Sequence, residues 1–84
     1  MAEVMIGTVS DFFARPVVAG IDLTGNLKCG EVIHIKGHTT DLEVVVESMQ
    51  IHNKDVTEGG PGDSIGIKVP DRVRRGDKVF KAIE

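Results

Sequence analysis

Several residue types are missing or rare in this chain of 84 residues, and each absence excludes a class of protein. Cys29 is the only cysteine, so no intrachain disulfide can form and a zinc site built on several cysteines is excluded. There is no tryptophan or tyrosine and there are only three phenylalanines, which argues against stacking of single-stranded bases on aromatic rings.

Long apolar runs are also missing. No stretch approaches the roughly 20 apolar residues that span a bilayer. The N-terminal residues carry Glu3 and Asp11 and lack both the basic start and the apolar run of a secretory signal. We therefore expect a cytoplasmic protein with no membrane contact.

What the chain does contain is β-branched apolar residues. Hydrophobic residues make up 40% of the sequence, and valine and isoleucine dominate them. Such side chains favour a pleated sheet, because their restricted χ1 costs less there than in a helix. At this length we expect a single domain, residues 1–84. A chain of this size has a small core, so a closed sheet is one way to avoid exposed sheet edges.

Six segments have the alternation or the apolar content of strands, with turn signals between them. They are Val4–Phe13, Val17–Leu23, Glu31–Lys36, Leu42–Ile51, Ser64–Val69 and Asp77–Ile83. No segment has a helical period, and no linker or internal repeat is present. The sequence predicts an all-β fold, a small closed six-stranded antiparallel β-barrel.

The barrel is organised around two of these strands. Leu42–Ile51 has apolar residues on both faces, which is typical of a central strand, whereas Ser64–Val69 alternates cleanly and has one wet face. Between them the sequence EGGPGD, residues 58–63, cannot continue a strand, because its glycines and Pro61 favour a turn.

The net charge of −3 argues against simple nonspecific binding to nucleic acid, but the charge is unevenly distributed. The segment Lys68–Lys81 carries a net charge of +4 and the remainder −7. For the arginines in this segment, Arg72, Arg74 and Arg75, two interpretations stay open. They are either a solvated charge run or a cluster of guanidinium forks that binds phosphate.

No motif for catalysis or for a cofactor is present. His34, His38 and His52 could gather at a metal only if the chain bends, because strand residues four apart are separated by about 13 Å. A solvated face is the simpler interpretation, and we expect no metal, no cofactor and no catalytic residue. No glycine-rich loop ends in Gly-Lys-Ser/Thr, so we expect no GTP hydrolysis.

An ordered set of motifs closely resembles the second domain of the translational GTPases, the family of elongation factor Tu and bacterial initiation factor two. The resemblance covers nearly the whole chain. The matching stretches are IGTV at 6–9, AGIDLTGNLKCGEVIHIKG at 19–37, VESMQIHNKDVTEGGPGDSIGIKV at 46–69 and VRRGDKV at 73–79.

This resemblance implies a six-stranded antiparallel barrel that contacts tRNA or ribosomal RNA. In tRNA-carrying members, the segment that corresponds to Gln50 and His52 helps to form the pocket for the terminal adenosine. We therefore expect a non-enzymatic module that binds RNA or the translation machinery. Gln50 and His52 would make the specific contact, and Arg72, Arg74, Arg75 and Lys78 would contact phosphates.

A second resemblance leaves an alternative open. The C-terminal barrel of the collagenase-like peptidase family shows a related G-x-V-x-D-[FY] start and a V-x-S-M segment, which correspond here to Gly7–Phe12 and Val46–Met49. The competing hypothesis is therefore a protein-interaction barrel that docks onto a larger factor or onto an RNA-modifying or peptidase-like enzyme. A homodimer formed through an exposed strand is a variant of that hypothesis.

Overall fold

The computed structural model describes residues 2–14 and 17–83, which form ten strands. Their bounds are β1 Ala2–Ala14, β2 Val17–Leu23, β3 Leu27–Lys28, β4 Val32–Lys36, β5 Asp41–Val45, β6 Met49–Ile51, β7 Lys54–Val56, β8 Glu58–Gly59, β9 Ser64–Lys68 and β10 Lys78–Ile83. No helix in the described residues is long and apolar enough to cross a membrane.

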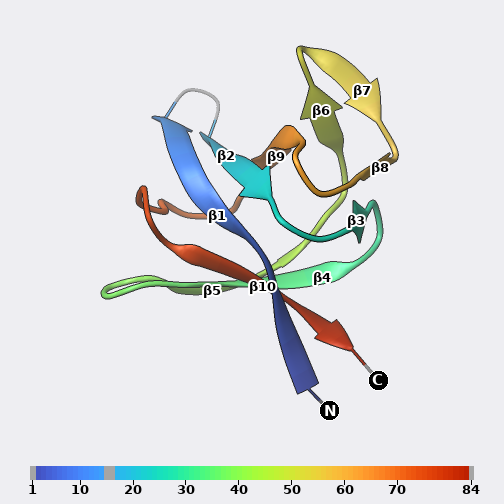
Figure 1. Ribbon diagram of the computed structural model, residues 1–84. Coiled ribbons are helices and arrows are strands. Elements are labelled where there is room, and N and C mark those ends of the chain that lie inside the picture. Colours follow the sequence, from blue (N-terminus) through green and yellow to red (C-terminus); the bar gives the residue numbers. More distant parts are fainter. Residues whose placement is uncertain (1, 15–16, 84) are drawn as a thin grey trace.

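Eight strands form one antiparallel sheet in the order β5-β4-β10-β1-β2-β9-β6-β7, and β3 and β8 form a separate pair. In Figure 1 the sheet curls strongly, with β1 and β10 crossing over β4 and β5 and with the β6–β7 hairpin at the top right. The two ends of the chain emerge side by side, as the pairing of Ala2 with Ile83 requires.

The core lies inside this curled sheet. Strand alternation turns one face inward, and Ile33, Ile35, Ile65 and Ile67 on that face are all at most 3% exposed. The buried apolar residues are Ile6, Val9, Ala19, Ile21, Leu23, Leu27, Ile33, Ile35, Val44, Val46, Met49, Ile65, Ile67, Val69, Val73 and Val79. The predicted all-β, antiparallel architecture is confirmed.

The predicted closed six-stranded barrel is wrong in its strand count and in its pairing. Leu42–Ile51 is not one central strand, because its first half, β5, pairs with β4 and its second half, β6, pairs with β9 and β7. Val46 continues the bonding toward β4, since its N–H donates to the carbonyl of Glu31 at 2.9 Å. Glu47 and Ser48 then cross to β6, so among the described strands β5 and β9 do not pair.

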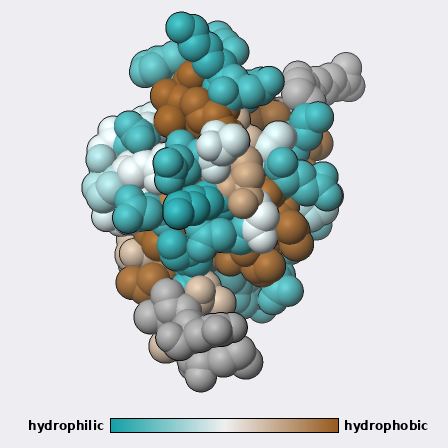
Figure 2. Space-filling model, turned by 90° about the vertical axis from the view of Figure 1, so that its right-hand side faces the viewer, coloured by the Kyte–Doolittle hydropathy of each residue, from teal (hydrophilic) through white to brown (hydrophobic). Residues whose placement is uncertain are grey.

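This crossing also changes which side chains face inward. Val45 and Met49 have the same parity in the segment Leu42–Ile51, yet Val45 is 54% exposed and Met49 is 1% exposed. The remaining hydrophobic surface is divided. Figure 2, which views the molecule from the right-hand side of Figure 1, shows separate hydrophobic areas between hydrophilic ones.

Candidate functional site: a groove with a glycine floor

The predicted contact residues Gln50 and His52 lie on the β6–β7 hairpin. Gln50 is exposed on β6, and its side-chain amide donates to the Oδ1 of Asp55 on β7 at 3.0 Å. His52 and Asn53 form the turn with φ values of 52° and 63°. Two consecutive positive φ values are typical of a type I′ hairpin turn, in which the exposed His52 has a defined position.

Gln50 belongs to a row of residues that crosses the outer face of the sheet. In the strand register Asp11 of β1 is paired with Gly20 of β2, Gly20 with Gly66 of β9, and Gly66 with Gln50 of β6. With a strand spacing of about 4.8 Å, the path along the sheet from Asp11 to Gln50 is about 14 Å. Only backbone lies between them, because both middle positions are glycine.

This arrangement produces a groove with a volume of about 460 Å³ on the outer face. It lies between the ends of β1 and β2 on one side and the β6–β7 hairpin on the other (Figure 1). The groove is lined by Ser10, Phe13, Val18, Gly20, Gln50, His52, Asn53, Ser64, Ile65 and Gly66.

The two glycines keep the groove open. A Cβ at Gly66 would lie 3.5 Å from Val18 Cγ1, which is ordinary contact, and a Cβ at Gly20 would lie 3.3 Å from the Cβ of Asp11. A larger side chain at position 66 would therefore project into the groove without meeting the core. Phe13 supplies an apolar wall, since 53% of it is exposed.

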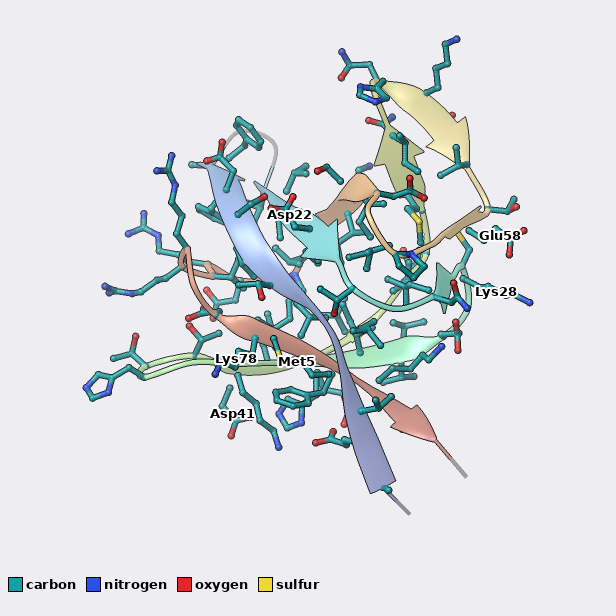
Figure 3. All side chains as sticks on the ribbon, viewed as in Figure 1. Met5, Asp22, Lys28, Asp41, Glu58 and Lys78 are labelled. Atoms are coloured by element: carbon teal, nitrogen blue, oxygen red, sulfur yellow. The ribbon has the colours of Figure 1, made fainter. Side chains whose placement is uncertain are left out.

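One polar group of the groove already has a partner. Ser64 Oγ already donates to Asp22 Oδ1 at 2.7 Å; Figure 3 labels Asp22 on β2. Within residues 2–14 and 17–83, no hydrogen bond joins His52 to a hydroxyl or a thiol, and no group of three or more His, Cys, Asp or Glu could hold a metal. Cys29 is half-buried elsewhere, and its thiol lies 3.7 Å from the carbonyl of Val56.

The three predicted arginines lie together in the connection between β9 and β10, and all three are exposed. Arg75 forms an ion pair with Asp11 at 3.5 Å, so it borders the same face as the groove. The guanidinium of Arg72 lies 6.0 Å from the centre of the Phe12 ring. Lys78 is not part of this loop, because it begins β10 and is paired with Lys36 of β4. Contact of these side chains with phosphate stays a prediction.

A different part of the sheet carries a network of ion pairs. His34 on β4 contacts the carboxylates of Asp41 and Glu3, and Lys36 donates to Glu3 at 2.9 Å. The hydrogen bond that His34 donates to Asp41 and, to a smaller extent, the one that it donates to Glu3 raise the pKa of His34. The Lys36 hydrogen bond lowers the pKa of Glu3, and the His34 hydrogen bond lowers that of Asp41. His34 is thus a partner in surface ion pairs.

The groove itself was not predicted from the sequence, although one signal was present. A glycine inside a strand often marks a close approach of backbone, and Gly20 and Gly66 both occupy the outer parity of their strands. Their alignment depends on the register between β2 and β9, which a single sequence does not specify.

Comparisons with known proteins identify what the chain is similar to. No protein-family model matches it. It is 43% identical over 79 residues to the uncharacterized protease MJ0090 of Methanocaldococcus jannaschii. The matched region covers 93% of this chain but only 19% of that protein. The chain therefore spans about a fifth of the length of this curated relative.

Two solved structures have the same fold. Both are crystal structures of the C-terminal domain of a Geobacillus thermoleovorans protein assigned to the U32 peptidases. The first has a TM-score of 0.86 at 14% identity and covers 93% of this chain and 91% of that chain. The second, a selenomethionine variant, has a TM-score of 0.85 at 13% identity and covers 90% and 96%.

These findings overturn the resemblance to domain two of the translational GTPases, and with it the hypothesis of a translation module that binds tRNA or ribosomal RNA. The motifs behind it mark turns and bulges. Gly7 lies at a register shift of β1, and Gly76 of the R-G-D motif has a φ of 88°. Small β domains of unrelated function can share such features. The chain is a homologue of a segment of the M. jannaschii protease and has the fold of a U32-type C-terminal domain.

Proposed function

We propose that this chain is a non-catalytic, protein-interaction domain that docks onto the catalytic part of a U32-type peptidase. The observation that carries the proposal is the uneven coverage of the M. jannaschii relative. The match spans 93% of this chain and 19% of that protease. Four-fifths of the relative thus lies outside the matched segment and is available to hold the active site that its name implies.

The groove is the surface that suits docking best. Its volume of about 460 Å³ is within the range of about 300–1,000 Å³ that is usual for binding pockets. Phe13 and Val18 provide apolar walls, while Gln50 and Asn53 provide hydrogen-bonding groups at one end. An apolar side chain of the partner would lie on the glycine floor and lose its water.

The connection between β5 and β6 supports this role by holding the hairpin wall of the groove. The segment Asp41–Ile51 bonds to β4 at its start and to β9 at its end. We infer that the covalent link from β5 to β6 substitutes for the missing hydrogen bonds between β5 and β9. The curled sheet then behaves as a closed barrel. The β6 wall is then held at a constant distance from β2.

The proposal is tested by capture from an extract of the cells that make this protein. The tagged chain is compared with its Gly66→Val variant, which fills the groove, and with Lys68→Val, the matched change at the next outward position of β9. We expect a U32-type peptidase to bind the wild type and the Lys68→Val control. Its recovery should resist nuclease and fall about tenfold or more with Gly66→Val.

Two results would contradict the proposal. One is recovery of nucleic acid with proteins that nuclease releases, which would indicate an RNA-binding module. The other is equal recovery of the peptidase by the wild type and by Gly66→Val, which would place the contact outside the groove.

A further inference from the structure

Strand β5 forms one end of the eight-stranded sheet, and among the described strands it pairs only with β4. Two hydrogen bonds define which of its residues face β4. Gly37 N–H donates to the carbonyl of Thr40 at 2.8 Å, and Val46 N–H donates to the carbonyl of Glu31 at 2.9 Å. Positions 40 and 46 therefore both turn their backbone polar groups toward the β4 side.

Backbone bonding alternates along an antiparallel strand. The even-numbered positions 42 and 44 therefore also direct their backbone N–H and carbonyl groups toward β4. The N–H and carbonyl groups of Asp41, Glu43 and Val45 point away from β4. The side chains of these three residues are exposed on the outer face. An exposed edge of this kind is a template for another strand.

The space beside this edge is hollow. A depression of about 320 Å³ separates β5 from the end of β9. It is lined by Glu43, Val44, Val45, Glu47, Lys68, Val69 and Pro70. Pro70 has no N–H to offer, so the β9 side is poorly suited to pair with an incoming strand. The β5 side retains its free donors and acceptors.

The charges on β5 and just after it indicate which kind of partner this edge would bind. Glu43 and Glu47 are exposed, and within the described part of the chain neither forms an ion pair. Two copies of β5 that paired antiparallel about Glu43 would place the two Glu43 carboxylates opposite each other, which is unfavourable. The acidic edge therefore disfavours a second copy of this chain and favours a basic segment.

An apolar contact is available next to the acidic one. Val45 is 54% exposed and its cross-strand partner Val32 is 39% exposed, so the two form a small exposed apolar pair at one end of β5. A strand residue two positions from the one opposite Glu43 would lie opposite Val45.

We propose that the β5 edge, Asp41–Val45, binds an extended peptide segment as an added strand, with a lysine or arginine opposite Glu43 and an aliphatic residue opposite Val45. This site is separate from the groove, because the groove is built on β1, β2, β9 and β6. It therefore does not rest on the proposed function.

The test is a titration of the intact chain with a short, blocked peptide that has valine and lysine at alternate positions. Three control peptides are used: one with glutamate in place of lysine, one with the order scrambled, and one with N-methylated amides on the bonding edge. We expect binding of the first peptide, at least about tenfold weaker binding of each control, and slowed amide exchange at Glu43 and Val45.

Two protein variants keep the test falsifiable. Glu43→Lys should weaken binding of the lysine peptide about tenfold or more and improve binding of the glutamate peptide. Glu58→Lys is the matched control and should leave binding unchanged; Figure 3 shows Glu58 on the opposite side of the molecule from Asp41. Thermal unfolding checks that both variants fold.

Equal binding of the lysine and glutamate peptides, or retained binding of the N-methylated peptide, would overturn the proposal. Loss of binding in Gly66→Val would overturn it as well, since the peptide would then occupy the groove. Failure of the peptide to bind the wild type also refutes strand addition here and leaves the groove proposal untouched.

Discussion

Two regions of one sheet use their outer surfaces differently. On β1, β2, β9 and β6 the outer face carries Gly20 and Gly66 and leaves a groove of about 460 Å³. On β4, β5 and the start of β1 the outer face is filled by the ion pairs of His34 with Glu3 and Asp41. Both regions share one continuous core, so the difference between their outer surfaces does not arise from the packing of the core.

This difference suggests that a domain this small uses one part of its outer surface for stability and another part for binding. The charged side chains of β4, His34 and Lys36, are paired with Glu3 of β1 and Asp41 of β5 and have little left to offer a partner. In the groove, backbone and apolar side chains are exposed, and no other residue in the described ranges covers them. Contiguous exposed apolar surface is one of the features that mark interaction sites. Substitutions should therefore divide into those that affect stability and those that affect docking.

The largest loss of stability is expected from the core that both regions share. Ile21 is fully buried beneath the groove, and Ile21→Ala should lower the free energy of unfolding by about 2–5 kcal/mol. Val45→Ala, at an exposed position, should cost less than about 1 kcal/mol. Urea denaturation measures both values. A similar cost for the two variants would show that the inner and outer faces are not distinguished as described.

The next largest effect is expected at Asp77, which is 5% exposed and anchors the arginine loop. Its Oδ2 accepts the Arg74 N–H at 2.9 Å. Asp77→Ala leaves that donor without its partner and should cost about 1–3 kcal/mol. Asp77→Asn retains an acceptor oxygen and should cost less. If both variants unfold at the same urea concentration, this hydrogen bond does not hold the loop.

Filling the groove should change binding much more than stability. A Cβ at Gly66 meets only ordinary contact, and valine favours a strand, so Gly66→Val should leave stability unchanged or raise it by up to about 1 kcal/mol. The same variant should lose docking. A destabilisation of several kcal/mol in urea would show that the glycine is required by the fold, and the comparison between the two regions would fail.

The smallest effect is expected at His34, and it should depend on pH. Its pKa is raised above the ordinary 6.5, so its ion pairs stabilise fully below that value and weaken as the pH rises through the raised pKa. The pKa values of Glu3 and Asp41 are lowered, so their share is lost only in more acidic solution. His34→Gln should therefore reduce Tm more at about pH 5.5 than at about pH 8.

Differential scanning fluorimetry at the two pH values measures this difference. Glu43 is paired with His34 across β4 and β5, so Glu43→Gln is a matched control that removes a neighbouring carboxylate without removing the network. An equal reduction of Tm by His34→Gln at both pH values would show that its ion pairs are absent in solution.

Much of the fold could be predicted from local pattern, because alternation of apolar residues determines which face of a strand is buried. Ser64–Val69 shows this, with Ile65 and Ile67 buried and Lys68 exposed as expected. The β6–β7 hairpin was missed, because His52-Asn53 is an uncommon pair for a type I′ turn and Lys54-Asp55 has no apolar signal.

The break between β5 and β6 and the groove were missed for a different reason. Both depend on which strands become neighbours: Val46 bonds to Glu31, fifteen positions earlier, and Gly20 is aligned with Gly66. A single sequence carries no record of such pairings. Gln50, His52 and Arg72 are exposed, but exposure alone does not reveal what they bind.

The central claim is that the groove, and not the ion-paired region, contacts the peptidase. The most direct measurement is a titration of the ¹⁵N-labelled chain with the peptidase recovered in the capture experiment, followed by amide chemical shifts. We predict that Gly20, Gly66 and Gln50 change most, and that amides around Lys36 on β4 stay in place. Changes centred on β4, with the groove amides unmoved, would contradict the account.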